Sequence, residues 1–347
     1  MDKIRLGKTD MMVSKLGFGG IPIQRVSEDE AVTVVKKCLD LGMNYIDTAN
    51  AYTTSEGRIG KAISGRREGI FLATKTHART GGGLANHLQL SLKQIGVEYI
   101  DLYQFHNVTD FDNLNMILGR DGAMAALEKA KEAGLVRHIG VTSHSLDMAK
   151  ELVKSGHFET IMFPFNFIAR EAADELLPLA REHDVGFIAM KPMSGGMLEN
   201  IKLAFKYLAQ FPDVLLIPGI GAVGEIEEIM QIMEGPLELT AEEQAEMEQI
   251  RQELGNRFCR RCDYCQPCPE EIPISTLMVT PSFARAWPPE RLFDGGMIAE
   301  GMAKAANCTK CGECEAKCPY ELPIRDMIEG YYNWYEAEKR KYQMSSK

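Results

Sequence analysis

The stretch IFLATKTHARTGGGLANHLQLSLKQIGVEYIDLYQFH, residues 70–106, holds two short apolar runs separated by an amphipathic segment. Apolar runs of this length are typical of buried strands, and the amphipathic segment 84–96 is typical of a surface helix. A strand, a helix and a second strand in this order predict two parallel strands joined by a crossover. The stretch therefore indicates an α/β fold.

The same alternation continues on both sides of this stretch. Eight strands are predicted, at residues 16–19, 43–47, 70–75, 100–106, 136–142, 160–164, 186–191 and 214–218. The predicted helices are 28–42, 56–64, 84–96, 122–133, 146–155, 171–183, 199–210 and 224–234. Eight such units fit a closed (β/α)8 TIM barrel better than an open sheet.

Shorter segments outside this repeat carry their own signals. Residues 3–15 alternate apolar and polar positions and predict a hairpin. Residues 81–83, three glycines, predict a flexible loop, because the strand–GxGxxG–helix context of a nucleotide motif is missing. Residues 107–121 and 192–197 predict loops that shape a pocket.

The composition changes near residue 255. A last helix is predicted at 241–254, after which cysteine and proline become frequent and the strand–helix alternation stops. We therefore predict a barrel domain at 1–254 and a small, mainly helical domain at 255–347.

The overall charge excludes some classes of partner. The net charge of −10 argues against nucleic acid, whose phosphates need a cationic face. No apolar run has the length that a bilayer requires, and the N-terminus lacks the apolar region of a signal peptide. We expect a cytoplasmic protein with no membrane partner.

The nine cysteines predict metal binding rather than disulfides. Cys38 stands alone in a helical pattern and is expected to be a small buried hydrophobe. The other eight form two tight groups in a chain without an export signal, which is typical of metal ligands.

Both cysteine groups have the spacing of iron–sulfur ligands. The runs are Cys259-x2-Cys262-x2-Cys265-x2-Cys268-Pro269 and Cys308-x2-Cys311-x2-Cys314-x3-Cys318-Pro319. The second run matches the bacterial ferredoxin pattern, in which the fourth cysteine binds the other cluster. Zinc is the alternative, because two CxxC pairs suffice for it. Eight cysteines in triplets followed by Cys-Pro favour two [4Fe–4S] clusters.

The ferredoxin pattern also predicts how the ligands divide. One cluster would be held by Cys259, Cys262, Cys265 and Cys318, and the other by Cys268, Cys308, Cys311 and Cys314. The first run has two residues, not three, before its last cysteine, so this division stays open.

Four polar residues follow the ends of neighbouring predicted strands: Asp47, Tyr52, Lys75 and His106. In an α/β barrel these ends form the active site. Lys75 ends a strand buried on both faces, where an unpaired ammonium is costly, and Asp47 on the adjacent strand would compensate its charge. The cation would also lower the pKa of Tyr52, which makes a phenol a better proton donor near neutral pH.

The chain resembles the aldo-keto reductases, in the branch with a C-terminal ferredoxin-like domain. The motifs that carry the resemblance are residues 16–20, 44–52, 74–75, 101–106 and 139–144. The resemblance implies that Tyr52 is the general acid that protonates a carbonyl oxygen. It further implies that Lys75 and Asp47 tune Tyr52 and that His106 orients the carbonyl.

The resemblance also implies a nicotinamide site, with departures from the family pattern. Thr142 and Ser143 stand where relatives have Ser-Asn to hold the carboxamide. Met190 replaces an aromatic residue that stacks on the nicotinamide ring, and Lys191 would face a cofactor phosphate.

The loop after the eighth strand would lie along the pyrophosphate. Its residues Gly219 and Gly221 let backbone approach phosphates closely. The next helix begins Gly224-Glu225-Ile226-Glu227-Glu228, without the basic residues that hold the 2′-phosphate of NADPH in relatives. These carboxylates favour NADH, although they also suit the helix dipole.

We therefore expect an NAD(P)H-dependent oxidoreductase that reduces a small carbonyl compound and carries two [4Fe–4S] clusters. Hydride transfer moves two electrons, whereas a cluster moves one. The clusters are therefore structural in one interpretation of this enzyme. One alternative is an electron-transfer enzyme in which a flavin in the barrel mouth links hydride transfer to the clusters and a redox partner protein. The other is a redox-sensing or partner-binding protein whose barrel activity is secondary.

Overall fold

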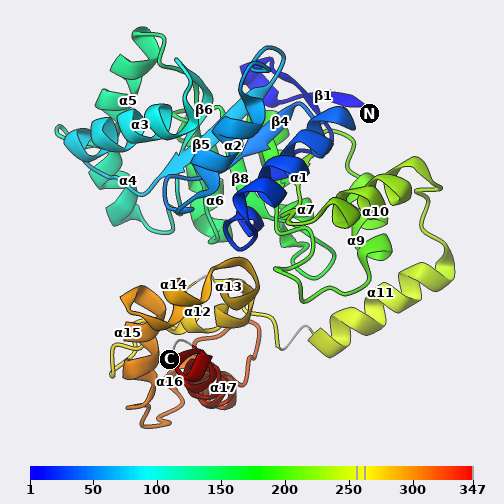
Figure 1. Cartoon of the computed structure of the whole chain (residues 1–347). Coiled ribbons are helices and arrows are strands. Elements are labelled where there is room, and N and C mark those ends of the chain that lie inside the picture. Colours follow the sequence, from blue (N-terminus) through cyan, green and yellow to red (C-terminus); the bar gives the residue numbers. More distant parts are fainter. Residues whose placement is uncertain (255–256, 262, 346–347) are drawn as a thin grey trace. The chain divides into compact units, whose positions relative to one another are not determined.

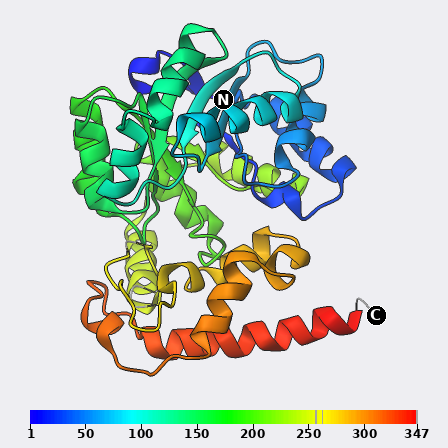
Figure 2. The ribbon, with the colours of Figure 1, turned by 90° about the vertical axis from the view of Figure 1, so that its left-hand side faces the viewer.

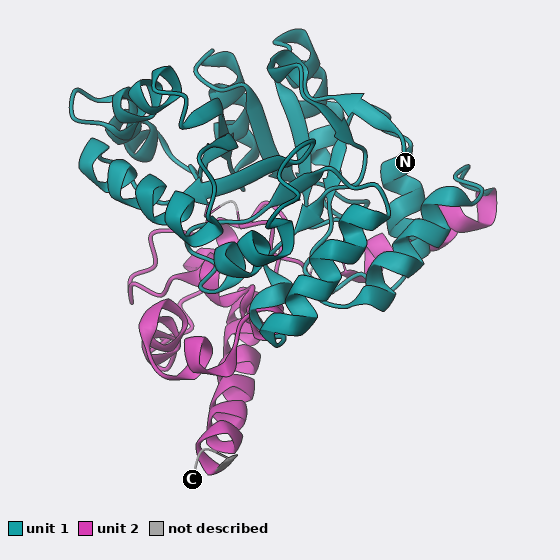
Figure 3. Ribbon diagram, turned by 45° about the horizontal axis from the view of Figure 1, so that its top comes forward, with its two compact units in different colours: residues 1–240 teal, residues 241–347 magenta. Residues whose placement is uncertain are grey.

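A computed structural model describes residues 1–254, 257–261 and 263–345. The chain forms two compact units, Met1–Thr240 and Ala241–Lys347 (Figure 3). The boundary predicted from composition falls at Gly255, outside the described residues, and it stays a prediction.

Unit 1 is an eight-stranded parallel barrel (Figure 1). Its strands are β3 (Phe18–Gly19), β4 (Tyr45–Asp47), β5 (Phe71–Thr76), β6 (Ile100–Phe105), β7 (Val136–Thr142), β8 (Thr160–Pro164), β9 (Gly186–Met190) and β10 (Leu215–Ile217). Each strand pairs with the next in chain order. Parallel bridges from Leu16 to Leu216 and from Gly19 to Gly219 bring the first and last strands together. The predicted TIM-like barrel is confirmed.

Helices follow the strands largely as predicted. They are α1 (Glu28–Asp40), α2 (Ser55–Ile63), α3 (Gly81–Ile95), α5 (Ala123–Glu132), α6 (Leu146–Lys154), α9 (Ile201–Ala209) and α10 (Val223–Glu234). The prediction of a loop at residues 81–83 is wrong, because these glycines form the first turn of α3. Thr80 caps the helix by accepting a hydrogen bond from Gly83 N.

Two further predictions in this unit are wrong. The predicted loop 107–121 contains α4 (Phe111–Leu118), which Asp110 caps and which buries Leu114 and Ile117. The predicted helix 171–183 is divided into α7 (Glu171–Asp174) and α8 (Leu176–Glu182). Pro178 explains the break, because proline has no N–H to donate to the preceding turn.

The N-terminal hairpin occupies one end of the barrel. Strands β1 (Lys3–Arg5) and β2 (Met12–Ser14) pair antiparallel around the short helix η1 (Gly7–Thr9), as predicted. Side chains of the hairpin pack with interior residues near the start of several strands: Leu6, Met11, Val13, Tyr45, Ala73 and Leu102. This end is therefore filled with apolar side chains, and polar chemistry lies toward the other end.

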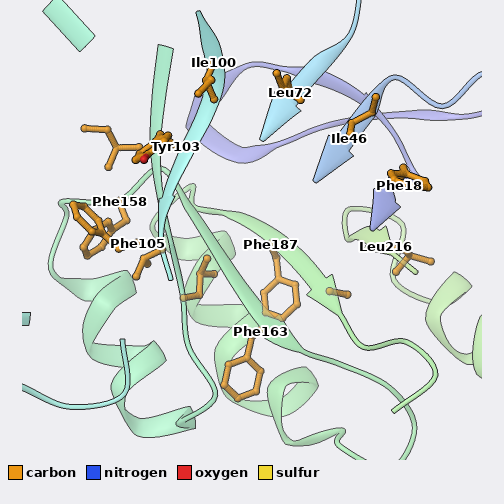
Figure 4. Packing of buried hydrophobic residues seen from close by; sticks show 14 of the residues in the cluster. Phe18, Ile46, Leu72, Ile100, Tyr103, Phe105, Phe158, Phe163, Phe187 and Leu216 are labelled. Atoms are coloured by element: carbon orange, nitrogen blue, oxygen red, sulfur yellow. The ribbon is translucent and has the colours of Figure 1, made fainter. Parts of the chain in front are cut away.

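A second apolar layer lies between the barrel wall and the helices. Figure 4 shows outward-facing strand residues of this layer, among them Ile46, Leu72 and Phe105. Because side chains alternate along a strand, their neighbours in sequence point into the barrel. Burying each large apolar side chain contributes about 1.5–3 kcal/mol.

Unit 2 is mainly helical, as predicted. It contains α11 (Ala241–Leu254), α12 (Ile274–Leu277), α13 (Thr280–Ala286), α14 (Pro289–Phe293), α15 (Gly296–Ala305), α16 (Glu313–Ala316) and α17 (Ile324–Ser345). The long helix α17 is red in Figure 2. Tyr335 anchors α17, because its buried hydroxyl donates to Leu292 O at 3.0 Å.

Across the described residues, no helix has both the length and the apolar character that crossing a membrane requires.

Candidate active site and cluster cavities

Strand alternation directs three polar side chains into the barrel at one level. Tyr45, Ala73 and Leu102 pack in the interior, and the residues two positions later on the same strands are Asp47, Lys75 and Gln104. The register pairs Lys75 with Gln104 on neighbouring strands. The three side chains therefore form one polar layer beyond the apolar plug.

Lys75 and Asp47 form a buried ion pair in this layer. Lys75 Nζ donates to Asp47 Oδ1 at 2.5 Å and to Thr48 O at 2.7 Å, and both side chains are at most 4% exposed. Gln104 Nε2 donates to Asp47 Oδ2 at 3.1 Å. Burial lowers the pKa of Lys75, but the charge of Asp47 and the nearby Tyr52 outweigh this and raise it. The ammonium is therefore charged at neutral pH.

Tyr52 and His106 lie beside this ion pair. Lys75 Nζ is 5.0 Å from the centroid of the Tyr52 ring. The rings of Tyr52 and His106 meet edge to face, with centroids 5.9 Å apart and an angle of 80° between their planes. Both side chains are half-buried, so they are accessible from the carboxyl ends of the strands. The structure brings together all four residues of the predicted tetrad.

Two residues that the sequence reasoning missed support His106. Arg79 Nη2 donates to His106 O at 2.7 Å, and the His77 ring stacks on the His106 ring with centroids 4.2 Å apart. Gln104 was also missed. Its signal was present, because it is a polar residue inside an apolar run and lies two positions before His106.

Thr142 and Ser143 are buried at the end of β7 and are tied to the His106 loop. Asn107, at a left-handed φ of 57°, donates from N to Thr142 Oγ1 at 2.8 Å. Its Oδ1 lies 2.7 Å from His144 Nδ1. The segment after β6 and the segment after β7 therefore form one hydrogen-bonded unit.

Met190 ends β9, one residue earlier than predicted, and Lys191 follows it; both are half-buried. Lys191 has a left-handed φ of 56°, and its carbonyl accepts from Asn166 Nδ2 at 3.0 Å. Ser194 in the following loop is 2% exposed, and its hydroxyl has no hydrogen-bond partner among the described residues.

Gly219 and Gly221 lie in the loop between β10 and α10. A Cβ on Gly219 would come within 2.9 Å of the Pro22 side chain, so the position requires glycine or a shift of that ring. Glu225 folds back on the same loop, where its Oε2 accepts from Gly221 N at 2.7 Å and from Ala222 N at 3.1 Å. The N-terminus of α10 therefore already holds a carboxylate of the chain itself.

The cysteines of unit 2 line two cavities. One is lined by Cys268, Cys308, Cys311 and Cys314. The other is lined by Cys259, Cys265 and Cys318. Cys262 lies outside the described residues. Each cavity thus combines cysteines from both runs, in the division that the ferredoxin pattern predicts.

The two cavities differ in exposure. Cys265 is 8% exposed, whereas Cys311 is exposed.

Within residues 1–254, 257–261 and 263–345, no three Cys, His, Asp or Glu side chains form a group that could hold a single metal ion. Cys38, by contrast, is buried in α1, as predicted, and burial raises its thiol pKa to about 12.

Comparison with known proteins supports both units. Residues 15–203 match the aldo/keto reductase family, and residues 258–323 match a 4Fe-4S dicluster domain. The chain is 32% identical over 212 residues to an uncharacterized oxidoreductase, YqkF, of Bacillus subtilis, covering 57% of this chain and 67% of that protein. It is 30% identical to L-galactose dehydrogenase of Arabidopsis thaliana, covering 56% of this chain and 66% of that one.

A solved structure shares the barrel. The aldo-keto reductase AKR11C1 from Bacillus halodurans, in its holo form, superimposes with a TM-score of 0.63 at 27% identity. The superposition covers 72% of this chain and 96% of that one. The chain therefore belongs to the aldo/keto reductase family of oxidoreductases and carries a 4Fe-4S dicluster domain at its C-terminus.

Proposed function

We propose that the barrel reduces a small carbonyl compound with a nicotinamide cofactor and that Tyr52 donates the proton. The observation that carries this proposal is the buried Lys75–Asp47 ion pair beside the half-buried Tyr52 ring. A cation held next to a phenol favours the phenolate and so eases proton donation.

The other residues of the layer have distinct roles in this proposal. Asp47, held by Gln104, fixes the ammonium of Lys75. His106, held by Arg79 and stacked on His77, would orient the carbonyl oxygen toward Tyr52. Thus the chain positions the carbonyl and the proton before reaction, which reduces the entropic cost of the step.

A nicotinamide cofactor supplies the hydride when it is bound. The residues proposed to hold it surround the same end of the barrel: Thr142, Ser143, Met190, Lys191, Gly219 and Gly221. The buried Ser194 hydroxyl beside Lys191 is a further donor that fits a phosphate oxygen.

We also propose that the eight cysteines hold two [4Fe–4S] clusters. The two cysteine-lined cavities support this assignment. The exposed Cys311 would give a redox partner protein access to one of the clusters.

Turnover with a panel of aldehydes and ketones tests the proposed reaction. We expect protein prepared without air to oxidise NADH in proportion to carbonyl consumed, followed by the loss of NADH absorbance and by product analysis. Absence of turnover across the panel would contradict the reductase proposal. Release of FMN or FAD from the purified protein would instead favour the flavin-linked alternative.

Glu225 is proposed to favour NADH over NADPH. Its carboxylate accepts from the N–H groups of Gly221 and Ala222, just before α10, and would repel a 2′-phosphate. We expect E225Q to tighten NADPH binding about fivefold relative to NADH binding, as measured by calorimetry. The matched control is E234Q, which removes an exposed carboxylate from the other end of the same helix. Equal ratios in the wild type and E225Q would refute the role of this carboxylate.

A further inference from the structure

A second buried carboxylate, Glu56, lies close to the tetrad. Glu56 is in the first turn of α2, four residues after Tyr52, and is 1% exposed. Acidic residues in a first helical turn usually interact with the helix dipole from the surface, as Glu28 and Glu30 of α1 do. Since that effect needs no burial, burial of Glu56 requires another explanation.

The contacts of Glu56 lead to the strand that carries Lys75. Thr74 Oγ1 donates to Glu56 Oε1 at 2.7 Å, and Thr74 immediately precedes Lys75 on β5. Because side chains alternate along the strand, Thr74 points to the helix layer and Lys75 points into the barrel. Glu56 is therefore on the outer side of the barrel wall, bonded to the residue next to Lys75.

The charges around Glu56 do not balance. Asp47 already compensates Lys75, and Glu56 has no ion pair within 4.0 Å among the described residues. Burial outweighs the hydroxyls of Thr74 and Ser91, the charge of Lys75 and the Asn50 amide, so the pKa of Glu56 is raised. Burial, together with the charge of Glu56, raises the pKa of Tyr103 on β6. Above the raised pKa of Glu56, its carboxylate, which has no ion-pair partner of its own in the described part of the chain, adds a negative charge behind the strand that carries Lys75.

We propose, on the basis of the reductase function above, that Glu56 is a positioning residue whose charge, held by Thr74 behind the barrel wall, sets the proton affinity of Tyr52. A negative charge there offsets part of the effect of Lys75 and keeps the phenol protonated to higher pH. Glu56 does not contact substrate in this proposal. It acts through β5 and the Lys75 ammonium.

The test measures Tyr52 directly and needs no turnover. Tyrosine labelled with ¹³C at Cζ reports each phenol by NMR, and Y52F identifies the Tyr52 signal. We expect E56Q to lower the Tyr52 pKa by about one unit, because the substitution removes one charge and keeps an acceptor for Thr74. The alkaline limb of the pH–rate profile of carbonyl reduction should shift by the same amount.

Two variants complete the design. E30Q removes a first-turn glutamate from α1, where it is exposed, and should leave the Tyr52 pKa unchanged. If E56Q does not fold, Glu56→Met combined with Thr74→Val replaces both hydrogen-bond partners by apolar groups of similar size, which is often nearly neutral for stability. It should give the same shift.

The outcomes separate the two proposals. An unchanged Tyr52 pKa in E56Q, with or without a lower melting temperature, would leave Glu56 a purely structural role and overturn the inference. A shifted pKa in a protein that reduces no carbonyl would support the inference and reject the reductase function.

Discussion

Tyr52→Phe is expected to lower kcat/KM for carbonyl reduction by about a hundredfold or more, with little change in melting temperature. The substitution removes only the hydroxyl, and general acid catalysis contributes about 10²–10⁴ in rate. The ring that packs against His106 and lies near Lys75 remains. Steady-state kinetics with NADH and the best carbonyl of the panel measure the effect.

Tyr99→Phe is a suitable control for this experiment. Tyr99 also loses only a hydroxyl, and its ring lies between Arg67 and Arg137, near the start of β6 and away from the tetrad. Y99F should retain the wild-type rate. If Y52F also retains it, Tyr52 is not the proton donor, and the assignment of the tetrad must be abandoned.

The cofactor should still bind to Y52F. Because the proposed nicotinamide site is built from the segments after β7, β9 and β10, its affinity does not depend on the Tyr52 hydroxyl. We therefore expect the loss to appear in kcat rather than in the Kd for NADH. This separation distinguishes loss of a proton donor from collapse of the site.

The barrel could be predicted from sequence because its signal is repeated and local. Eight apolar runs between amphipathic segments identify parallel strands, and all eight strands are present. The errors occur where local signals compete. The glycines at 81–83 favour a loop, but the cap at Thr80 extends the helix over them. In 107–121, burial of Leu114 and Ile117 stabilises α4 despite a short and weak pattern.

The part of the candidate site that lies at the ends of the strands could be predicted from the sequence. Asp47, Lys75 and His106 lie at or next to the carboxyl ends of the neighbouring strands β4, β5 and β6, so the barrel topology alone brings them together. Arg79 and Glu56 could not be found in this way. The role of Arg79 depends on backbone carbonyls after β6, and that of Glu56 depends on a hydrogen bond through the wall to Thr74. Neither contact follows from a fixed spacing between residues in the sequence, so no sequence motif predicts it.

Paired alanine substitutions in the cysteine runs are expected to show how the clusters divide their ligands. Cys318 belongs to the second run but lines the cavity of Cys259 and Cys265. If ligation is crossed, C265A and C318A disable the same cluster. Each single variant and the double variant should then all retain about four of eight irons per chain. Iron and sulfide analysis of protein purified without air measures this.

The converse pair makes the test decisive. Cys265 and Cys268 belong to the same run but line different cavities, so the C265A/C268A double variant should lose nearly all iron. Ligation within each run predicts the reverse, with about four irons in C265A/C268A and nearly none in C265A/C318A. Cys38→Ala controls for a general loss of stability. Cys38 is buried in α1 of the barrel unit, so this variant should have an unchanged iron content. Each double variant replaces two cysteines by alanine, and crossed ligation and ligation within each run predict opposite iron contents for the two variants. A difference in iron content between C265A/C318A and C265A/C268A therefore reports which cysteines share a cluster and not a general loss of stability.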